Sequence, residues 1–369
     1  MRLLKDLLDL KELECNVEKG YVSVRHHPSL PYRILNYTKQ AAADYAWNNV
    51  TETCRGLIVD DNDVVIARPF RKFYNYSEIV AKGEESTIPD EKFTIYDKLD
   101  GCLGILFVTP DGKLDIATRG SMTSSQSEWA AEFLNKRLSA DEIRELRDMI
   151  CVESDGVWMQ NKTLCFEIIY NGERHVVDYG GREFLTLLAV IDNETGKDLS
   201  LDPFKKFFNT PDTFDCDWSN VRTKFPRSNA EGFVIKFESG FRMKIKYDEF
   251  LNAQRIVHGL TFRRIFDAVK DGKLSEIVPY LSRLEEETAL YIKEQMREIV
   301  DTYFDTEFDA LLEYKDFETD KEAAEYFKTR KEPSVLFCVR KNQDYSNIIW
   351  KRTKEKLKEK KTFSDDYGE

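Results

Sequence analysis

The feature that most constrains the fold is a change in hydrophobic pattern at about residue 250. Before it, short alternating or apolar runs are separated by turn-forming residues, which is typical of antiparallel hairpins. These runs are RGLIVDDNDVVIA, FTIYDKLDGCLGILFVTPDGKLDIATRG, TLCFEIIYNGERHVVDYGG, FLTLLAVIDNETG and AEGFVIKFESGFRMKIKY. Helices are expected in the N-terminal leucine stretch and in SEWAAEFLNKRLSADEIRELRDMI, where SADE is typical of a helix cap.

After residue 250 the pattern becomes that of amphipathic helices, as in FRRIFDAVKDG and EEETALYIKEQMREIVDTYFDTEFDALLEY. The change predicts an α+β chain with two domains: residues 1–250, built on antiparallel sheets, and residues 251–369, all-α. The lysine-rich end, WKRTKEKLKEKKTFSDDYGE, favours a solvated helical face over an RNA contact.

Composition points to a reducing compartment. No apolar run reaches the ~18 residues of a membrane span, and MRLLKDLLDLKELE at the start mixes acids into its leucines, unlike a signal peptide. Seven cysteines without a CxxC pair favour neither a disulfide framework nor a zinc site. We expect a soluble, cytoplasmic protein without a membrane partner.

The net charge and the few histidines limit the kinds of ligand that the chain can bind. A net charge of -12 and a pI near 5.1 argue against coating nucleic acid, so a polyanion would have to bind a local patch. With only four histidines, a metal would be a hard ion held by carboxylates, water and phosphate, and magnesium is the natural candidate.

Lys98, in YDKLDGCLG, is the first candidate for chemistry. A lysine is a nucleophile only as the neutral amine, which requires burial or nearby cations to lower its pKa. Taken alone, KLDG is more typical of a strand followed by a turn with a surface lysine, because a four-residue motif has a high false-positive rate.

The stretch EGFVIKFESGFRMKIKY adds three charged candidates. Glu231 heads one strand, while Lys244 and Lys246 are two residues apart on its hairpin partner and so share a face. A phosphate would satisfy both lysines, and their field would help to keep a nearby Lys98 deprotonated. The alternative is a hairpin with a lysine-rich outer face.

Three further residues are suited to binding a nucleotide. Arg55 precedes a glycine at the start of an apolar strand, and Lys72 lies among aromatic residues in ARPFRKFYNYSE. Arginine suits bidentate phosphate or ribose contacts and lysine suits a terminal phosphate, although either residue alone is more often structural. Glu167 is a lone acid in the apolar run TLCFEIIY, so it must be paired, exposed or facing a ligand.

In order, the chain carries CRG, KFYN, KLDG, RGS, FEIIY, EGFVI and MKIK. This series resembles the covalent nucleotidyltransferases, the superfamily of polynucleotide ligases and capping enzymes. Within it, the chain looks most like the RNA ligase 1 family of T-even bacteriophages, over roughly residues 30 to 250. The resemblance implies that the first domain is a nucleotidyltransferase domain.

The resemblance assigns catalytic roles by position. Lys98 would attack the α-phosphorus of ATP, expel pyrophosphate and hold AMP as a phosphoramidate. Lys244 and Lys246 would contact the α-phosphate, and Glu231 would act through a magnesium ion near it. Asp100 would support the later steps.

It also implies a set of residues that bind the nucleotide: Tyr37, Arg55, Lys72, Lys98, Gly101, Arg119, Glu167, Lys244 and Lys246. Arg55 and Lys72 would hold ribose and triphosphate with help from Arg119. Glu167 would contact the adenosine side. Gly101 would keep the backbone clear of the nucleotide.

The implied reaction joins RNA ends in three steps: enzyme adenylylation, AMP transfer to an RNA 5'-phosphate, and attack by a 3'-hydroxyl. ATP and Mg²⁺, with Mn²⁺ as a substitute, are the implied cofactors. Nicked tRNA is a candidate substrate, an end-healing kinase or phosphatase a candidate partner, and a monomer the expected state. A phage-encoded enzyme would work in the host cytoplasm.

Two competitors are weighed against this interpretation. An mRNA-capping guanylyltransferase or a DNA ligase usually has an OB domain after KIK, where this chain is predicted to be helical. A non-catalytic RNA-binding protein would not need Lys98, Glu231, Lys244 and Lys246 together.

Three positions depart from the family pattern. Cys102 stands where serine is common, and Arg119 where lysine is common. Where an aromatic residue often stacks on the base, TLLAVID offers only aliphatic residues such as Leu187. The preference for ATP over GTP is therefore implied by the resemblance alone.

Overall fold

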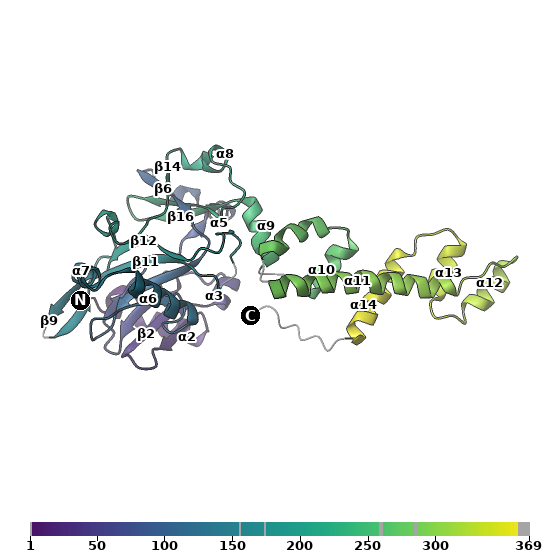
Figure 1. Cartoon of the computed structure of the whole chain (residues 1–369), viewed down its shortest axis with the longest axis horizontal. Helices are drawn as coiled ribbons and strands as arrows, with labels where there is room; N and C mark the ends of the chain where they lie inside the picture. The colour runs from purple at the N-terminus through teal and green to yellow at the C-terminus, as the bar shows by residue number, and fades with distance from the viewer. Residues whose placement is uncertain (1, 155, 173–174, 258–260, 284–285, 361–369) are drawn as a thin grey trace. The chain divides into compact units, whose positions relative to one another are not determined.

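The computed structural model describes residues 2–154, 156–172, 175–257, 261–283 and 286–360. The chain divides into two compact units, Met1–Leu251 and Asn252–Glu369. Figure 1 shows the strands in the first unit and helices in the second. The predicted α+β class, with antiparallel sheets before a helical region, is confirmed.

The first unit contains three sheets and a hairpin. The N-terminal sheet has the order β1-β2-β3-β4, formed by Val22–His26, Tyr32–Tyr37, Arg55–Asp60 and Val65–Ala67. The hairpin pairs β9 (Cys151–Ser154) with β10 (Val157–Gln160).

The other two sheets have five strands each, and they carry Lys98, Glu167, Lys244 and Lys246. One has the order β13-β12-β11-β7-β8, formed by Asp198–Leu199, Phe184–Asp192, Lys162–Ile169, Cys102–Val108 and Leu114–Thr118. The other has the order β14-β6-β15-β16-β5, formed by Thr213–Phe214, Phe93–Lys98, Gly232–Phe237, Arg242–Lys246 and Tyr74–Asn75. Neighbouring strands are antiparallel, except that β5 runs parallel to β16.

The helices of the first unit are short. They are α1 (Leu4–Leu7), α2 (Leu10–Glu18), α3 (Lys39–Ala43), α4 (Asn49–Thr53), α5 (Tyr76–Lys82), α6 (Ser125–Arg137), α7 (Ala140–Ile150) and α8 (Val221–Lys224). The predicted cap in SADE is confirmed: Ser139 accepts the backbone N–H of Glu142, whose carboxylate accepts the N–H of Ser139.

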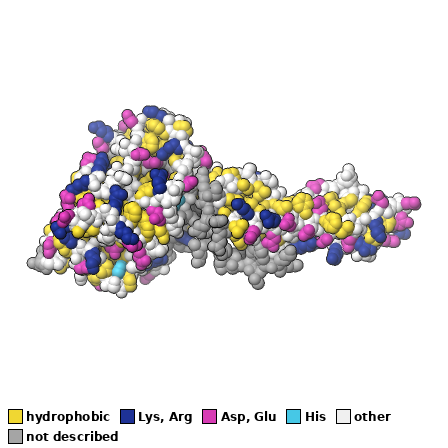
Figure 2. Space-filling model, in the orientation of Figure 1, with side chains coloured by type: hydrophobic (Ala, Val, Ile, Leu, Met, Phe, Trp, Pro, Cys, Tyr) yellow, Lys and Arg dark blue, Asp and Glu magenta, His cyan; other side chains and the backbone are white. Residues whose placement is uncertain are grey.

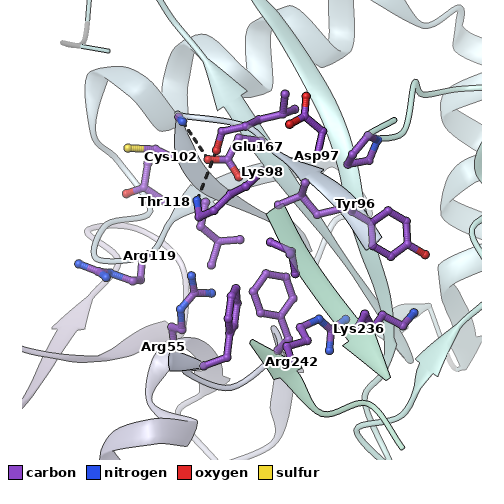
Figure 3. A pocket seen from close by; sticks show the side chains of 18 of the residues that line it. Arg55, Tyr96, Asp97, Lys98, Cys102, Thr118, Arg119, Glu167, Lys236 and Arg242 are labelled. Carbon is purple, nitrogen blue, oxygen red and sulfur yellow. Dashed lines mark hydrogen bonds between the residues drawn. The ribbon is translucent and has the colours of Figure 1, made fainter. Parts of the chain in front are cut away.

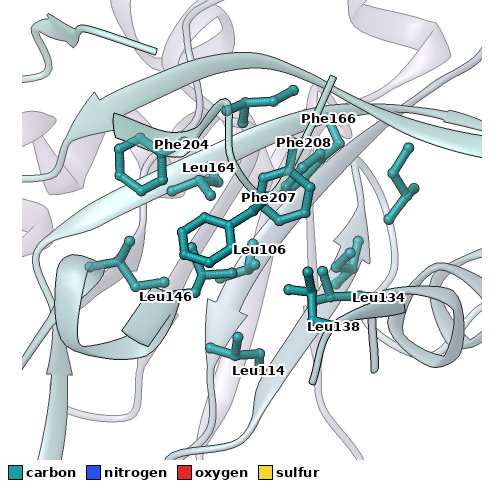
Figure 4. Close-up of a cluster of buried hydrophobic side chains, with 14 of the residues drawn as sticks. Leu106, Leu114, Leu134, Leu138, Leu146, Leu164, Phe166, Phe204, Phe207 and Phe208 are labelled. Atoms are coloured by element: carbon teal, nitrogen blue, oxygen red, sulfur yellow. The ribbon is translucent and has the colours of Figure 1, made fainter. Parts of the chain in front are cut away.

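The main core lies where α6 and α7 pack on the β11–β7 sheet (Figure 4). The central strands β7 and β11 are buried on both faces, which explains why their sequences read as continuous apolar runs. Phe166 of β11 is fully buried and meets Phe208 edge-on, with ring centroids 4.8 Å apart. This packing fixes β7, which begins four residues after Lys98.

The second unit is helical throughout its described residues. After α9 (Asp248–Val257), which spans the division, come α10 (Phe262–Lys270), α11 (Glu286–Leu312), α12 (Asp320–Phe327), α13 (Pro333–Arg340) and α14 (Ser346–Lys360). The lysine run lies on α14, and the acidic end, residues 361–369, lies outside the described residues. Across the described ranges, no helix is both long enough and apolar enough to cross a membrane.

A core substitution should show how far the first unit depends on this packing. Phe166→Ala removes a fully buried ring, so we expect it to lower the free energy of unfolding by about 3–5 kcal/mol. Tyr45→Ala, at a side chain that is 73% exposed, should change it by less than about 0.5 kcal/mol. Urea denaturation followed by circular dichroism measures both, and equal effects would contradict the assignment of this core.

Candidate active site

Lys98 ends β6, and Glu231 directly precedes the neighbouring strand β15. In the antiparallel register Lys98 lies opposite Gly232, which brings its Nζ within 2.8 Å of Glu231 Oε2. Lys246, at the end of β16, also pairs with Gly232 in register, and its Nζ lies 2.8 Å from Glu231 Oε1. Both carboxylate oxygens of Glu231 are therefore bound by lysines.

These ion pairs are largely withdrawn from water. The side chains of Lys98, Lys246 and Glu231 are 18%, 11% and 4% exposed. Burial alone would raise the pKa of Glu231, but the two lysines outweigh burial and hold the pKa below its ordinary value. Burial alone would likewise lower the pKa of Lys98, but the charges of Glu231 and Glu167 hold that pKa above its ordinary value.

The ion pair between Lys98 and Glu231 bears on the expected protonation state of Lys98. The cations nearby were expected to keep Lys98 deprotonated, whereas the structure pairs it with a carboxylate that stabilises the ammonium form. Lys98 must lose both this partner and its proton before it can act as a nucleophile.

Lys244 lies on the same face of β16 as Lys246, as the spacing predicts. Its Nζ lies 5.5 Å from the centroid of the Phe73 ring. Burial, together with the positive charges of Lys98 and Lys246, lowers the pKa of Lys244 to about 7. A buried lysine in this state gains its charge when an anion binds beside it.

A cavity of about 460 Å³ adjoins Lys98 (Figure 3). Its volume is within the usual range for small-molecule sites. Five of the predicted residues line it: Arg55, Lys98, Gly101, Arg119 and Glu167. In Figure 3, Lys98, Glu167 and Cys102 lie toward one end, and Arg55, Lys236 and Arg242 toward the other.

Arg55 presents an unsatisfied guanidinium to this cavity. Its Nη1 is buried and has no hydrogen-bond partner among the described residues, and burial lowers the pKa of Arg55. Its Cζ lies 4.9 Å from the centroid of Phe70, as does the Cζ of Arg242. Because buried polar groups in proteins are normally hydrogen-bonded, Arg55 marks a place for an anionic or polar ligand.

Glu167 sits in the middle of β11 and is 8% exposed. Its Oε1 accepts the backbone N–H of Gly101 at 3.0 Å, and burial raises its pKa to about 7. A side chain on Gly101 would collide with β11, because a Cβ there would lie 2.4 Å from the carbonyl oxygen of Ile168. The absence of a side chain at position 101 thus has a structural cause, whether or not a nucleotide also comes close.

The remaining predicted residues lie around the cavity without lining it. Asp100 accepts the backbone N–H groups of Val176 and Val177 at 2.6 and 2.9 Å, so it ties the KLDG turn to another segment of the chain. The hydroxyl of Tyr37 accepts a hydrogen bond from Arg119 at 2.7 Å. Lys72 lies over the ring of Tyr74, and burial lowers its pKa to about 8.

Sequence reasoning missed several cavity residues and misplaced one. Leu187 is fully buried in the core, while its neighbour Leu188 faces the cavity. Aromatic rings are also present, from Phe70, Phe73 and Tyr96. Arg242 could have been found, because it precedes Lys244 by two residues on one strand and therefore shares its face.

Glu231 is the predicted metal ligand, and its hard carboxylate oxygens suit magnesium. Within the residues that the structure describes, no three His, Cys, Asp or Glu side chains cluster as a metal cage. Magnesium is commonly held by one or two carboxylates together with water and substrate phosphates, so the residues present fit that kind of site.

The ion pairs of Glu231 make a direct prediction. Glu231→Gln removes the charge that holds up the pKa of Lys98, and burial should then lower that pKa. Acetylation of Lys98 can be quantified by mass spectrometry across a pH series. The midpoint of acetylation should lie at a lower pH in Glu231→Gln than in the wild-type protein. Glu238→Gln, on the exposed turn after β15, is the control and should not move it. An unchanged midpoint in Glu231→Gln would contradict the pairing.

The chain can be compared with protein families, with curated protein sequences and with solved structures. A family model described as RNA ligase matches residues 53–250. A search of curated protein sequences found no match. Among solved structures, an archaeal ATP-dependent RNA ligase is 14% identical, with a TM-score of 0.48, covering 94% of this chain and 95% of that one.

Two further structures are similar at the level of the chain trace. A putative ATP-dependent DNA ligase from Aquifex aeolicus is 12% identical, with a TM-score of 0.45 over 91% of this chain and 89% of that one. A variant of the Naegleria gruberi RNA ligase with ATP and Mn is 16% identical, with a TM-score of 0.36 over 50% of this chain and 59% of that one. The family-model match spans more than half of the 369 residues and includes Lys98, Glu167, Glu231 and both lysines of β16, and the chain therefore belongs to the RNA ligase family.

Proposed function

We propose that this RNA ligase uses ATP to join a 3'-hydroxyl and a 5'-phosphate through lysyl-AMP and RNA-adenylate intermediates. The observation that carries the proposal is the position of Lys98. It lines a cavity of nucleotide size, pairs with Glu231, and lies near Lys244, Lys246 and Arg55, three basic side chains that can meet the phosphates of a nucleotide.

In the first step the Nζ of Lys98 attacks the α-phosphorus of ATP. A nitrogen–phosphorus bond forms and the bond to pyrophosphate breaks. The ammonium group loses two protons, one to solvent before the attack and one to solvent or pyrophosphate as the phosphoramidate forms. The carboxylate of Glu231 accepts the N–H of Lys98 before the reaction and directs that nitrogen. Glu231 would hold a magnesium ion, which would supply neutralisation of phosphate charge.

Lys244 and Lys246 are placed to stabilise the charge that develops on the α-phosphate. They stand beside Lys98 on the neighbouring part of the sheet, held there by the β15–β16 hairpin. Arg55 offers its unsatisfied nitrogen to the nucleotide inside the cavity, and Arg119 offers its guanidinium at the exposed rim. Alignment and charge neutralisation supply most of the rate in such transfers.

The architecture favours this activity over the competing ones. A capping enzyme or DNA ligase usually has an OB barrel after the last lysine motif. Here α9 follows β16 directly, and the described part of the second unit contains helices and no β-strand. All seven cysteines are free, which supports a reducing cytoplasm. A monomer that receives nicked tRNA from an end-healing kinase or phosphatase completes the proposal.

Labelling with ATP carrying radioactive phosphorus at the α-position tests the covalent step. The wild-type protein should retain label after denaturation, and Lys98→Ala should retain none because no other amine takes its place. Lys113→Ala, at an exposed lysine paired with Asp111, should label normally. Label that persists in Lys98→Ala would overturn the assignment. Offering GTP in place of ATP, and DNA ends in place of RNA ends, separates the competing enzymes.

Proton uptake on binding of a nucleotide analogue tests the role of Lys244, whose pKa is lowered. At pH 8 Lys244, with its pKa lowered to about 7, is mostly neutral in the free protein. Phosphate binding favours its charged form, so binding of the α,β-methylene analogue of ATP should take up protons at pH 8. Calorimetry in buffers of different ionisation enthalpy measures this uptake, and Lys244→Met should reduce it. Equal uptake in the two proteins would contradict a charge-gaining role for Lys244.

A further inference from the structure

Beside the cavity lies a series of cations and rings that extends beyond Tyr37, Lys72 and Arg119, the members assigned to the nucleotide. We define the cation–aromatic row as Arg119, Tyr37, Trp47, Lys72, Tyr74 and Lys82. Tyr37 meets Trp47 edge-on with ring centroids 5.1 Å apart, and Trp47 meets Tyr74 edge-on at 6.3 Å. These rings come from β2, from the loop before α4 and from β5, so the fold assembles the row from separate segments.

Each ring of the row has a cation on it. The Cζ of Arg119 lies 4.7 Å from the centroid of Tyr37. Lys72 Nζ lies 4.0 Å from the Trp47 centroid and 3.5 Å from that of Tyr74, and Lys82 Nζ lies 4.5 Å from Tyr74. Arg119 lines the cavity and Lys82 ends α5, so the row leads from the cavity to an exposed helix end.

The acids near the row already have partners. Glu52 accepts the hydroxyl of Tyr74 and a hydrogen bond from Arg71. Glu78 accepts the backbone and side-chain N–H groups of Asn75 at 2.6 and 2.7 Å. The charges of Glu78 and Glu52 still act on Lys72. Lys82, at the exposed end of α5, has no carboxylate ion pair among the residues that the structure describes, so its charge is available to an anion. In Figure 2 the basic and acidic side chains on the visible face of this unit are interspersed.

Tyr45 adds an exposed ring two residues before Trp47. It is 73% exposed and has a φ of 52°, a left-handed conformation that is unusual for a bulky residue. Its carbonyl accepts the backbone N–H of Trp47 at 2.8 Å, which fixes the turn to the row. An aromatic side chain held out in water at a conformational cost indicates a binding role.

We propose that Tyr45 and the cation–aromatic row bind single-stranded RNA next to the ligation junction. Alternating rings and cations are how proteins hold a single strand without reading its sequence: the bases stack and the cations meet phosphates. The proposal rests on the ligase function. Two cations of the row can act in two successive steps. Lys72 and Arg119 hold the outer phosphates of ATP, and they become available to RNA phosphates once pyrophosphate has left.

The test uses full-length protein converted to its AMP form, with a fluorescent 5'-hydroxyl RNA of about 12 nucleotides, a length within the usual range for single-strand sites. This RNA cannot accept AMP, so anisotropy reports binding alone. The variants are Tyr45→Ala and Lys82→Gln, neither of which belongs to the nucleotide machinery. Lys136→Gln, an exposed lysine paired with Glu132, is the matched control.

All variants should take up AMP like the wild type. Tyr45→Ala should weaken RNA binding about 10-fold through loss of one stacked base. Lys82→Gln should reduce the slope of log affinity against log salt by about 0.7, the change expected for one phosphate contact on a single strand. Lys136→Gln should change neither.

Normal charging with unchanged affinity and unchanged slope in both variants would overturn the proposal and place the RNA elsewhere. A wild-type protein that takes up no AMP would instead refute the proposed function, and this inference with it. Because Tyr45→Ala removes a bulky side chain from a strained exposed position, it should not lower the melting temperature, and weaker binding cannot then be attributed to unfolding.

Discussion

The contact on which the site depends is the buried carboxylate of Glu231 held between Lys98 and Lys246. It exists because β6, β15 and β16 are neighbours whose register brings Lys98 and Lys246 to the same position, opposite Gly232. A shift of one residue in either pairing would turn one lysine to the other face of the sheet. The apolar face of these strands, with Phe233, Ile235 and Met243 buried, therefore fixes the positions of Lys98 and Lys246 as well as the core.

Around this contact several basic side chains are buried at a cost. Burial depresses the pKa of Lys244 and of Lys72, and it leaves a nitrogen of Arg55 without a partner in the described structure. Such groups cost stability in the free protein and recover it when an anion binds. The acidic net charge of the chain does not conflict with this, because Arg55, Arg119, Lys236 and Arg242 are gathered at one cavity.

Much of the architecture could be predicted because each strand and each helix produces its own periodic pattern in the local sequence. The period-two alternation of RMKIK gave the shared face of Lys244 and Lys246, and the change of pattern near residue 250 gave the helical region. The pairing of Lys98 with Glu231 could not be predicted, because it depends on which strands are neighbours across 133 residues of chain. For the same reason Tyr37, Trp47 and Tyr74 gave no sign that they meet. Leu188 was missed because β11 and β12 change register through a bulge.

Two glycines of the motifs owe their identity to the backbone. A Cβ on Gly232, whose φ is 148°, would lie 2.1 Å from the carbonyl oxygen of Ile245, and one on Gly101 would meet β11. The fold requires both whether or not a nucleotide ever binds. A relative that had lost catalysis and survived as a scaffold would therefore keep these glycines. Their presence in a chain with this fold is evidence of the fold and not of activity.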